Sequence, residues 1–591
     1  MEKKYYTSER NVQIVISLLK QHGIKRVIAS PGTTNMTFLG SIQSDPFFEI
    51  YSSVDERSAA YLACGLASET GEPVVINCTG ATASRNYMPG LTEAFYRKLP
   101  VLAITGHRGD SEIGHLKDQQ IDRRSTPHDV VLESVTVPMV KDDTSERYCI
   151  DQANKAILAL TTNGGGPAHI NLFTEYNRDF SVKQLPAARC IRKYTIYDEW
   201  PVLPKGKIGV FVGVHQPFTD AETEAIEKFC ATYDAVVFTS HISGYRGSYE
   251  VNFSLPCSQM RHRTSLVELD LMIHIGEISG GCYAPFSQST WRVSPDGQVR
   301  DTFGNLTKVF QMPEQQFFEH YAKEGQSKNA FLKACIDENI RIQTMVPELP
   351  FSNLWIAQQI SSKIPEGSRL FFGILNTLRT WNMFPLPKSV IASCNVGGYG
   401  IDGGVSTMIG ASFANKNKLY IGVFGDLGFF YDMNVVGNRH VGNNVRIMLI
   451  NNGRGTEFRL FNHPCAIFGE DADAYLAAAG HYGNQSPMLI KHFAEDLGYQ
   501  YLSASNKEDF LKSMDVFISS KIGDKPILFE VFTDKKEESD ALEALMNIEK
   551  AEFIDVAKAT AKKVMPTSVI NAVKNLVKQK SGGTLPGVTV E

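Results

Sequence analysis

"FGDLGFFYDMNVVGNRHVGNNVRIMLINNGRGTEF" spans residues 424–458 and contains two apolar runs, each of which ends in a polar pair. Gly425-Asp426 follows the first run, and Asn451-Asn452 follows the second. The runs have the length and composition of buried parallel strands. In an open parallel sheet, ligands bind at the carboxyl ends of the strands. We therefore expect the two polar pairs to face one ligand from neighbouring strands.

The side chains at these strand ends suit a magnesium ion that carries a diphosphate. The carboxylate of Asp426 and the amide oxygen of Asn452 are hard oxygen ligands, and Mg²⁺ completes its octahedron with phosphate oxygens and water. The backbone carbonyl of Arg454 could supply a third protein oxygen. The glycines of "NNGRG" (451–455) let the backbone approach a diphosphate closely. The stretch therefore predicts a magnesium and diphosphate site.

The bulk properties favour small-molecule chemistry. The 591-residue chain has a formal charge of −5, which argues against nucleic-acid binding through a broad basic surface. Its ten cysteines stand singly without zinc-ligand spacing, which is typical of buried thiols in a reducing compartment. The N-terminus lacks the apolar core of a signal peptide, and no run is long enough to span a bilayer. We expect a cytoplasmic protein without a membrane span.

Three α/β segments follow one another along the chain, without low-complexity stretches or short repeats. Each segment alternates apolar runs with helical patterns, as parallel strands joined by crossover helices do. The predicted domains cover residues 1–185, 186–345 and 350–540, and a helical extension covers 541–591. The predicted fold class is α/β, with three consecutive doubly wound parallel-sheet domains and a helical C-terminal tail.

The C-terminal tail has the pattern of a basic amphipathic helix. Apolar residues recur at helical spacing with lysines on the opposite face; they are Val569, Ile570, Val573, Leu576 and Val577. Such a helix can touch a membrane or a partner. Docking on its own protein is the favoured interpretation.

The first segment contains a second informative stretch, "VDERSAAYLACGLASETGEPVVINCTGATASRNYMPGLTEAFYRKLPVLAIT" (54–105). Together with residues 424–458 it resembles the thiamine-diphosphate-dependent superfamily of 2-oxo-acid decarboxylases and carboligases. The resemblance covers nearly the full length and implies pyrimidine-binding, central and diphosphate-binding domains in that order. It also implies a homodimer or homotetramer, because the superfamily builds each site from the pyrimidine domain of one subunit and the diphosphate domain of another.

By this resemblance Glu56 hydrogen-bonds the aminopyrimidine ring of the cofactor. A carboxyl group in an apolar pocket has a raised pKa, so a proton shared with the ring nitrogen favours the tautomer that activates the thiazolium carbon. The alternative is an exposed acid at a helix N-terminus, favoured by the helix dipole. The implied cofactor-binding residues are Glu56, Thr79, Gly80, Ile401, Gly425, Asp426, Leu427 and Asn452. The implied ligands of Mg²⁺ are Asp426, Asn452 and the carbonyl of Arg454.

The glycines of "NVGGYGIDGGVSTMIGASFA" (395–414) permit another interpretation. Gly398-x-Gly400-x-x-Gly403 follows a strand and opens a helix, with Asp426 some twenty residues on, as in a dinucleotide fingerprint. Alone it would favour a dehydrogenase, but an aspartate that contacts a ribose needs neither an Asn-Asn pair nor Glu56. By the resemblance, Ile401 is the apolar wedge that holds thiamine in its bent form. The alternative for Ile401 is a core position.

Within the superfamily the chain is most similar to the menaquinone-pathway synthases that make 2-succinyl-5-enolpyruvyl-6-hydroxy-3-cyclohexene-1-carboxylate from 2-oxoglutarate and isochorismate. The motifs "SPGTT", "DERSA" and "GDLGFFYDMN" carry this likeness. It implies that Gln119 lies near the thiazolium as a catalytic residue, and that Arg108 and Arg379 hold substrate carboxylates through bidentate contacts. The alternatives are a surface-loop glutamine and two surface ion pairs.

Several positions depart from the synthase pattern. Thr33-Thr34 stands in place of Ser-Arg, the position of a second substrate arginine falls near Val396, and a central basic pair is replaced around Gly281, Cys282 and Tyr283. A site built for three carboxylates would then leave buried anions unpaired, which is costly. These departures predict a paralogue with the same cofactor chemistry and another substrate pair.

The predicted function is thiamine-diphosphate- and Mg²⁺-dependent decarboxylation of a 2-oxo acid, with transfer of the acyl-anion equivalent to an acceptor. The alternatives are an acetolactate-synthase-like enzyme that uses pyruvate, a simple 2-oxo-acid decarboxylase, and an inactive binding subunit. An inactive subunit predicts loss of Glu56 or Asp426, and both are present. The identities of the 2-oxo acid and of the acceptor stay open.

Overall fold

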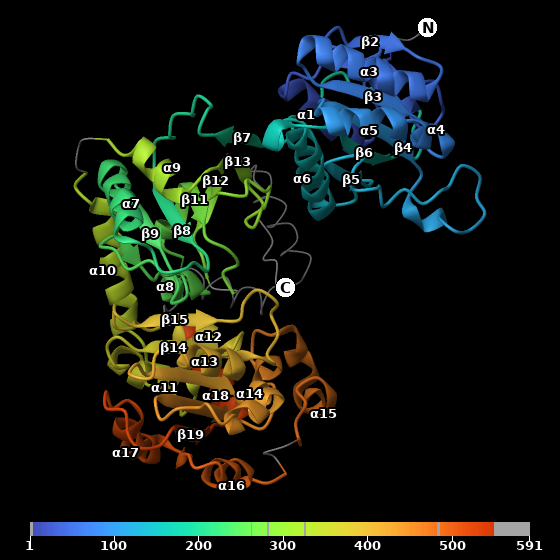
Figure 1. Ribbon diagram of the computed structural model, residues 1–591. Helices are drawn as coiled ribbons and strands as arrows, with labels where there is room; N and C mark the ends of the chain where they lie inside the picture. Colours follow the sequence, from blue (N-terminus) through green and yellow to red (C-terminus); the bar gives the residue numbers. More distant parts are fainter. Residues whose placement is uncertain (1–3, 262, 281–282, 324–326, 482–484, 549–591) are drawn as a thin grey trace, which may run out of the picture. The chain divides into compact units, whose positions relative to one another are not determined.

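The computed structural model describes residues 4–261, 263–280, 283–323, 327–481 and 485–548 (Figure 1). The chain divides into two compact units. Counting only the described residues, the first unit falls within 4–206, 270–275 and 287–321, and the second within 207–269, 276–286 and 322–548. Three parallel sheets, flanked by helices, make up the α/β fold that the sequence predicts.

The first sheet is fully parallel, in the order β2-β1-β3-β4-β6-β5. Its strands are β1 (Arg26–Ala29), β2 (Glu49–Ser52), β3 (Val74–Cys78), β4 (Val101–His107), β5 (Glu133–Val137) and β6 (Ala168–Phe173). Its helices are α1 (Arg10–Gln21), α2 (Met36–Ile42), α3 (Glu56–Thr70), α4 (Thr82–Asn86), α5 (Met88–Arg97) and α6 (Asp143–Ala159).

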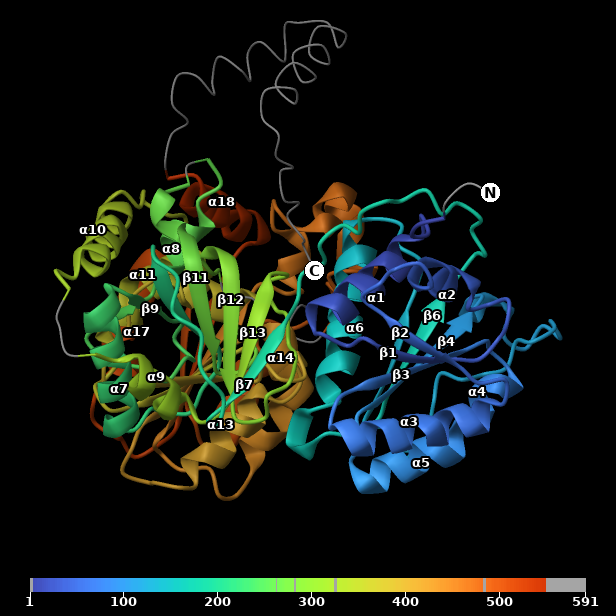
Figure 2. The ribbon, with the colours of Figure 1, turned by 90° about the horizontal axis from the view of Figure 1, so that it is seen from above.

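Helices cover both faces of this sheet, α3 and α5 on one side and α1, α2 and α6 on the other (Figure 2). The strands are apolar on both sides because successive residues point to opposite faces. Val74 and Ile76 pack with α3 and α5, while Val75 between them packs with α1 and α6. The continuous apolar runs of the sequence therefore reflect burial on both faces.

The middle sheet has the order β10-β9-β8-β11-β12-β13-β7. Its strands are β7 (Arg192–Thr195), β8 (Ile208–Val212), β9 (Val236–Phe238), β10 (Glu250–Val251), β11 (Glu268–Ile275), β12 (Phe286–Ser294) and β13 (Leu306–Gln311). The helices of this part of the chain are α7 (Asp220–Tyr233), α8 (Ser254–Ser258), α9 (Glu314–Tyr321) and α10 (Ala330–Thr344).

The third sheet is fully parallel, in the order β15-β14-β16-β17-β19-β18. Its strands are β14 (Arg369–Phe372), β15 (Ile391–Cys394), β16 (Tyr420–Gly425), β17 (Val445–Asn451), β18 (Gln500–Ala504) and β19 (Ile527–Phe532). One face packs on α11 (Asn353–Ile360), α12 (Asn376–Trp381), α17 (Lys507–Phe517) and α18 (Lys535–Met546). The other packs on α13 (Gly404–Ser412), α14 (Asp426–Asp432) and α16 (Leu489–Asp496), and α15 (Ala472–Tyr475) follows the β17 loops.

The apolar runs at β1, β3, β4, β8, β9, β11, β14–β17 and β19 are strands, as predicted. Several strands were not predicted, among them β7 and β12. Their sequences, "RKYT" and "FSQSTWRVS", are polar or alternate with polar residues, which masks the strand signal. Within the described residues, no helix is long and apolar enough to cross a membrane. The predicted tail helix with Val569 to Val577 lies outside the described residues.

Candidate active site

The ends of β16 and β17 bring the two polar pairs of residues 424–458 to one edge of the third sheet. The strands are parallel neighbours, and Gly425 is paired in register with Ile450. Asp426 then starts α14, and Asn452 starts the loop after β17. Gly453 has φ +74°, a left-handed conformation that glycine adopts without strain, so the loop turns sharply back. The adjacency expected from the sequence is confirmed.

Asp426 is a buried acid in contact with this loop. Its side chain is 3% exposed, and Oδ1 accepts the backbone N–H of Leu427 at 2.8 Å. Burial raises the pKa of Asp426 to about 7, against the opposing effect of backbone hydrogen bonds from Leu427, Gly453 and Arg454. No Lys, Arg or His side chain of the described chain forms an ion pair with this carboxylate. A bound divalent cation would compensate the charge at this position.

Asn452 presents an oxygen that no protein group satisfies. Its Oδ1 is buried and has no hydrogen-bond partner in the described chain, which is costly unless a ligand binds there. The neighbouring Asn451 is used differently, because its amide donates to Glu530 of β19 at 2.7 Å. Tyr501 donates to the same carboxylate at 2.8 Å. Glu530 is fully buried, so its hydrogen bond ties Asn451, just before the loop, to β19.

These residues fit a magnesium ion bound by few protein ligands. The described residues contain no group of three or more His, Cys, Asp or Glu side chains suited to a metal. One carboxylate and one amide oxygen agree with the preference of Mg²⁺ for sites completed by phosphate and water. The guanidinium of Arg454 forms an ion pair with Asp473. Only its backbone carbonyl is a candidate ligand.

The other predicted cofactor residues of this unit lie around α14. Ile401 is 38% exposed, and its backbone carbonyl oxygen would lie 3.0 Å from a Cβ at Gly428 of α14. A side chain at position 428 would therefore make a tight contact with this carbonyl oxygen. Leu427 is half-buried, and one of its methyl carbons would lie 3.5 Å from a Cβ at Gly455. The wedge candidate, the cation candidates and the glycine-containing loop therefore belong to one region of the second unit.

Arg379 does not present a free guanidinium. Its Nη1 donates to Glu457 Oε1 at 2.6 Å, so a carboxylate of the protein occupies the group predicted to hold a substrate carboxylate. The pair lines a cavity of about 40 Å³ together with Asn376, Asn462 and Leu542. The other Glu457 oxygen, Oε2, is buried without a hydrogen-bond partner.

The positions that depart from the synthase pattern have mostly structural contacts. Val396 is 3% exposed and packs against Gly280, where a Cβ would lie 2.7 Å from it. Thr34 is buried, and its hydroxyl accepts the backbone N–H of Gly80 at 3.1 Å. Tyr283 lines the cavity beside Arg379. Gly281 and Cys282 lie outside the described residues.

In the first unit, Glu56 is the first residue of α3. Asp55 caps this helix by accepting the backbone N–H of Ser58 at 3.2 Å. The Glu56 side chain is half-buried, and its Oε2 accepts the amide of Asn86 at 3.3 Å. Its charge contributes to the raised pKa values of Cys78 and Tyr87, both mainly raised by burial. The residue therefore lies beside an apolar region, with one weak hydrogen bond.

Thr79 and Gly80 lie in a tightly packed turn after β3. A Cβ on Gly32 would lie 2.1 Å from the Thr79 methyl, so "PGTT" packs directly on this turn. A Cβ on Gly80 would meet the Gly106 carbonyl oxygen at 3.0 Å. The turn is thus held by close backbone approach.

Gln119 and Arg108 lie in the segment after β4. Gln119 is exposed and has φ +59°, a strained conformation for this residue type. Arg108 donates to the Asp118 carbonyl, and its Nη2 lies 3.8 Å from the Asp118 carboxylate. Their roles at the substrate stay predictions.

Sequence reasoning missed three acidic residues of these regions. Glu457 pairs with Arg379, and the buried Glu530 accepts the amide of Asn451. Asp473, which is partly buried, pairs with Arg454, Arg459 and Lys535. No spacing signal marks such partners, because they meet only after the chain folds.

Comparisons with known proteins agree with the geometry. The family described as "Thiamine pyrophosphate enzyme, N-terminal TPP binding domain" matches residues 10–126. The 2-succinyl-5-enolpyruvyl-6-hydroxy-3-cyclohexene-1-carboxylate synthase of Bacteroides thetaiotaomicron is 30% identical over 556 residues, which cover 90% of this chain and 98% of the synthase. The chain belongs to the thiamine pyrophosphate enzyme family.

Its similarity to other synthases of this family is comparable. The synthase of the same description from Phocaeicola vulgatus is 29% identical, with coverage of 91% of this chain and 98% of the relative. The synthase from Flavobacterium psychrophilum is 26% identical, with coverage of 89% of this chain and 96% of the relative. A solved Rhodococcus jostii RHA1 thiamine diphosphate-dependent 4-hydroxybenzoylformate decarboxylase is 18% identical, with a TM-score of 0.39 and coverage of 89% and 99%. The family match at residues 10–126 and the 30% identical synthase identify the chain as a thiamine-diphosphate-dependent enzyme.

Proposed function

We propose that this enzyme decarboxylates a 2-oxo acid without a second, distal carboxylate and transfers the acyl-anion equivalent to an acceptor, with thiamine diphosphate and Mg²⁺. The observation that carries the substrate part is the ion pair between Arg379 and Glu457. A substrate carboxylate would have to displace Glu457 and leave it unpaired in a cavity, which is unfavourable. A substrate with a methyl or short alkyl group in place of that carboxylate would leave the Arg379–Glu457 ion pair intact. This supports a substrate pair other than 2-oxoglutarate and isochorismate.

When bound, thiamine diphosphate would supply the electron sink that decarboxylation of a 2-oxo acid needs. The residues of this chain bind and orient it. Glu56 would hydrogen-bond the aminopyrimidine ring, and Thr79 and Gly80 would contribute to the same binding region. Asp426 and Asn452 provide oxygen ligands for Mg²⁺, supported by the burial of Asp426 and by the unpartnered Oδ1 of Asn452.

A simple assay tests the substrate assignment. CO₂ release is measured with pyruvate, 2-oxobutyrate and 2-oxoglutarate, with and without an acceptor aldehyde. We expect kcat/KM for 2-oxobutyrate or pyruvate to exceed that for 2-oxoglutarate by at least about tenfold, since a charged hydrogen bond is worth about 1.5–3 kcal/mol. Glu457→Gln frees Arg379 and should raise kcat/KM for 2-oxoglutarate by about tenfold. The double variant with Arg379→Gln should lose this gain. Wild-type preference for 2-oxoglutarate, unchanged in Glu457→Gln, would contradict the assignment.

The metal assignment has its own test. Asp426→Ala should remove the Mg²⁺-dependent part of thiamine diphosphate affinity, because the only carboxylate among the proposed ligands is lost. Titration of the cofactor by tryptophan fluorescence, with Mg²⁺ and with EDTA, measures that part. Asp402→Ala, which removes an exposed acid of the Ile401 loop, is the control and should keep the Mg²⁺ dependence. Equal wild-type affinity with Mg²⁺ and EDTA would refute the metal site.

We also propose that the enzyme is a homodimer or homotetramer. The support is the family resemblance, in which each active site takes one domain from each of two subunits. The predicted residues agree with such a division, because Glu56 lies in one compact unit and Asp426 in the other.

A further inference from the structure

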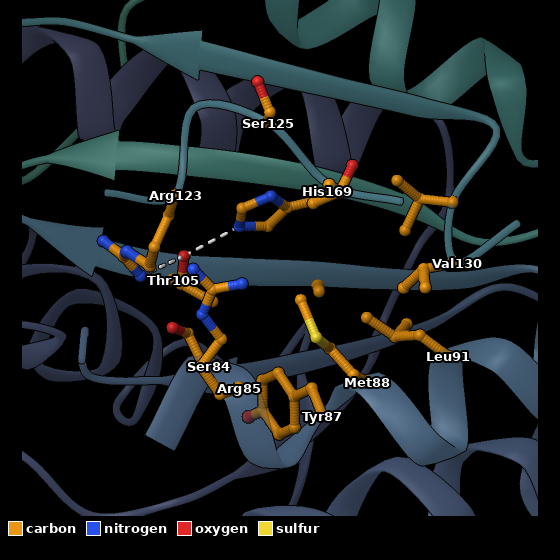
Figure 3. A pocket seen from close by; sticks show the side chains of 13 residues that line it. Ser84, Arg85, Tyr87, Met88, Leu91, Thr105, Arg123, Ser125, Val130 and His169 are labelled. Carbon is orange, nitrogen blue, oxygen red and sulfur yellow. Dashed lines mark hydrogen bonds between the residues drawn. The ribbon is translucent and has the colours of Figure 1, made fainter. Parts of the chain in front are cut away.

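The first unit contains a pocket that none of the predicted cofactor or substrate residues lines. It lies among β4, β6, α4, α5 and the segment before β5 (Figure 3). Met88, Leu91, Val130 and Val131 form an apolar wall. The cavity measures about 30 Å³, room for about two water molecules. Its lining includes Arg85 and Ser125, which are exposed, so the pocket reaches the surface.

Arg123 brings a buried positive charge to this pocket. The residue is 5% exposed, and its guanidinium donates to Thr105 Oγ1 at 2.9 Å and to the Gly106 carbonyl at 3.0 Å. Both acceptors are neutral. Within the described chain no carboxylate forms an ion pair with Arg123, and its buried Nε has no hydrogen-bond partner. A buried cation without an anion is costly, so this charge needs a partner from elsewhere.

The hydrogen-bond network behind Arg123 cannot supply that negative charge. Arginine only donates, so Thr105 Oγ1 accepts from it and can give its own proton to His169 Nε2, which lies 2.8 Å away (Figure 3). The other ring nitrogen, Nδ1, then carries the proton and donates to Ser134 Oγ at 3.1 Å. Burial lowers the pKa of His169 to about 3, so the ring is neutral. The network orients Arg123 without adding a negative charge, and Asp110 acts on Arg123 only from beyond ion-pair distance.

Arg85 adds a second cation at the same pocket. Its guanidinium donates to the Asp122 carbonyl at 2.8 Å and forms no ion pair within the described chain. Burial lowers the pKa of Arg123 to about 10, and the nearby charge of Arg85 contributes to this decrease. Arg123 stays charged at neutral pH. Two like charges that face one cavity repel each other, and an anion between them relieves this repulsion.

We propose that this pocket binds a carboxylate of one or two carbons, the size of formate or acetate, which suits a cavity of this volume. The carboxylate lies between Arg123 and Arg85, in the bidentate geometry that guanidinium groups favour. The short apolar end, a C–H or a methyl group, contacts Met88, Leu91, Val130 and Val131. Neither the identity of the substrates nor the metal site enters this assignment.

The site is linked to Glu56 through α4. Arg85 lines the pocket, and the next residue, Asn86, donates its amide to the Glu56 carboxylate. A ligand that holds Arg85 also restrains the short helix that positions Asn86. Occupancy should therefore change the environment of Glu56.

Binding of defined acids to the full-length, thiamine-free enzyme tests the proposal. Formate, acetate and the neutral acetamide are compared by saturation-transfer NMR and calorimetry. Formate and acetate should bind, and acetamide should not. Absence of binding of both acids at about 50 mM, or equal binding of acetamide, overturns the proposal.

Three arginine variants locate the binding site. Arg85→Gln and Arg123→Gln should each weaken acid binding by at least about tenfold. Arg124→Gln is the matched control, because Arg124 is exposed and pairs with Asp122 instead of lining the pocket. It should bind the acids within about twofold of wild type. If Arg123→Gln does not fold, the exposed Arg85 still decides the result. Equal weakening by Arg85→Gln and Arg124→Gln would overturn the assignment.

Discussion

Three buried acids of the second unit differ in what surrounds them. Asp426 has backbone N–H donors and an unsatisfied amide oxygen nearby, as expected of a cation site. Glu530 accepts hydrogen bonds from Asn451 and Tyr501 and so fixes the end of β17, where the loop begins. Glu538 is 2% exposed and accepts the backbone N–H of Asn353 at the start of α11, at 2.9 Å. Its position is structural, so its ionisation should affect stability.

Glu538 gives a pH prediction. Burial raises its pKa from 4.5 to about 7. The folded state therefore holds a proton that the unfolded chain releases, and the free energy of unfolding falls as pH rises from about 4.5 to about 7. Below about pH 4.5 this contribution is fully present. A shift of that size corresponds to about 3 kcal/mol.

The measurement is the urea midpoint between pH 4.5 and 8. The wild type should lose stability across this window relative to Glu538→Gln, whose amide does not titrate. Glu543→Gln, at an exposed position of the same helix, is the control and should follow the wild-type curve. Parallel curves for wild type and Glu538→Gln would show that the carboxyl group titrates normally.

Among the elements, α3 and α5 pack closely at one glycine. A Cβ on Gly90 of α5 would lie 2.4 Å from the Ala60 Cβ of α3 and 2.9 Å from its carbonyl carbon. This contact fixes α3, which presents Glu56, against the helix that lines the pocket of Figure 3. The position of the predicted catalytic acid thus depends on a residue that has no side chain.

Gly90→Ala should destabilise the protein by about 1–3 kcal/mol, because the methyl group cannot fit without moving α3. Gly65→Ala is the matched comparison. Gly65 lies inside α3 with no atom within 4 Å of its Cβ position, so alanine there should stabilise the helix by about 0.5–1 kcal/mol. Chemical denaturation of both variants measures the effects. Similar stability of the two would contradict the close packing of α3 and α5.

In the whole molecule, the predicted catalytic and metal residues belong to different compact units. Glu56 is in the first unit and Asp426 in the second. The proposed oligomer takes one unit from each of two chains for every active site. The activity of mixed dimers, with one unit mutated in each chain, should therefore show whether sites form between subunits.

Glu56→Gln and Asp426→Ala should each lower activity by at least about 100-fold. Co-expression with two different tags yields mixed dimers that carry one variant of each kind. If sites form between subunits, such a dimer has one intact site and should show about half of the wild-type activity. Singly tagged dimers of either variant are the controls. Mixed dimers as inactive as the controls would show that each site is built within one chain.

Sequence reasoning located the region of the cation site because its signals are local. Asp426 and Asn452 each follow an apolar run, and a parallel sheet places the carboxyl ends of its strands at one edge. Glu457 gave no such signal. Its effect depends on Arg379, 78 residues away in the chain, at a 2.6 Å contact that exists only in the folded unit.

The sequence by itself determined the α/β class and the neighbouring strands β16 and β17, and its motifs carried the resemblance that identified the cofactor family. The class and the strands follow from apolar runs and from the polar residues that end them, which short-range geometry governs. Only the tertiary structure decided which charges are compensated. Arg379 is paired with a carboxylate, whereas Arg85 and Arg123 line one pocket and form no ion pair within the described chain. Whether a charge is paired depends on residues distant in sequence, because burial and pairing arise when the chain folds.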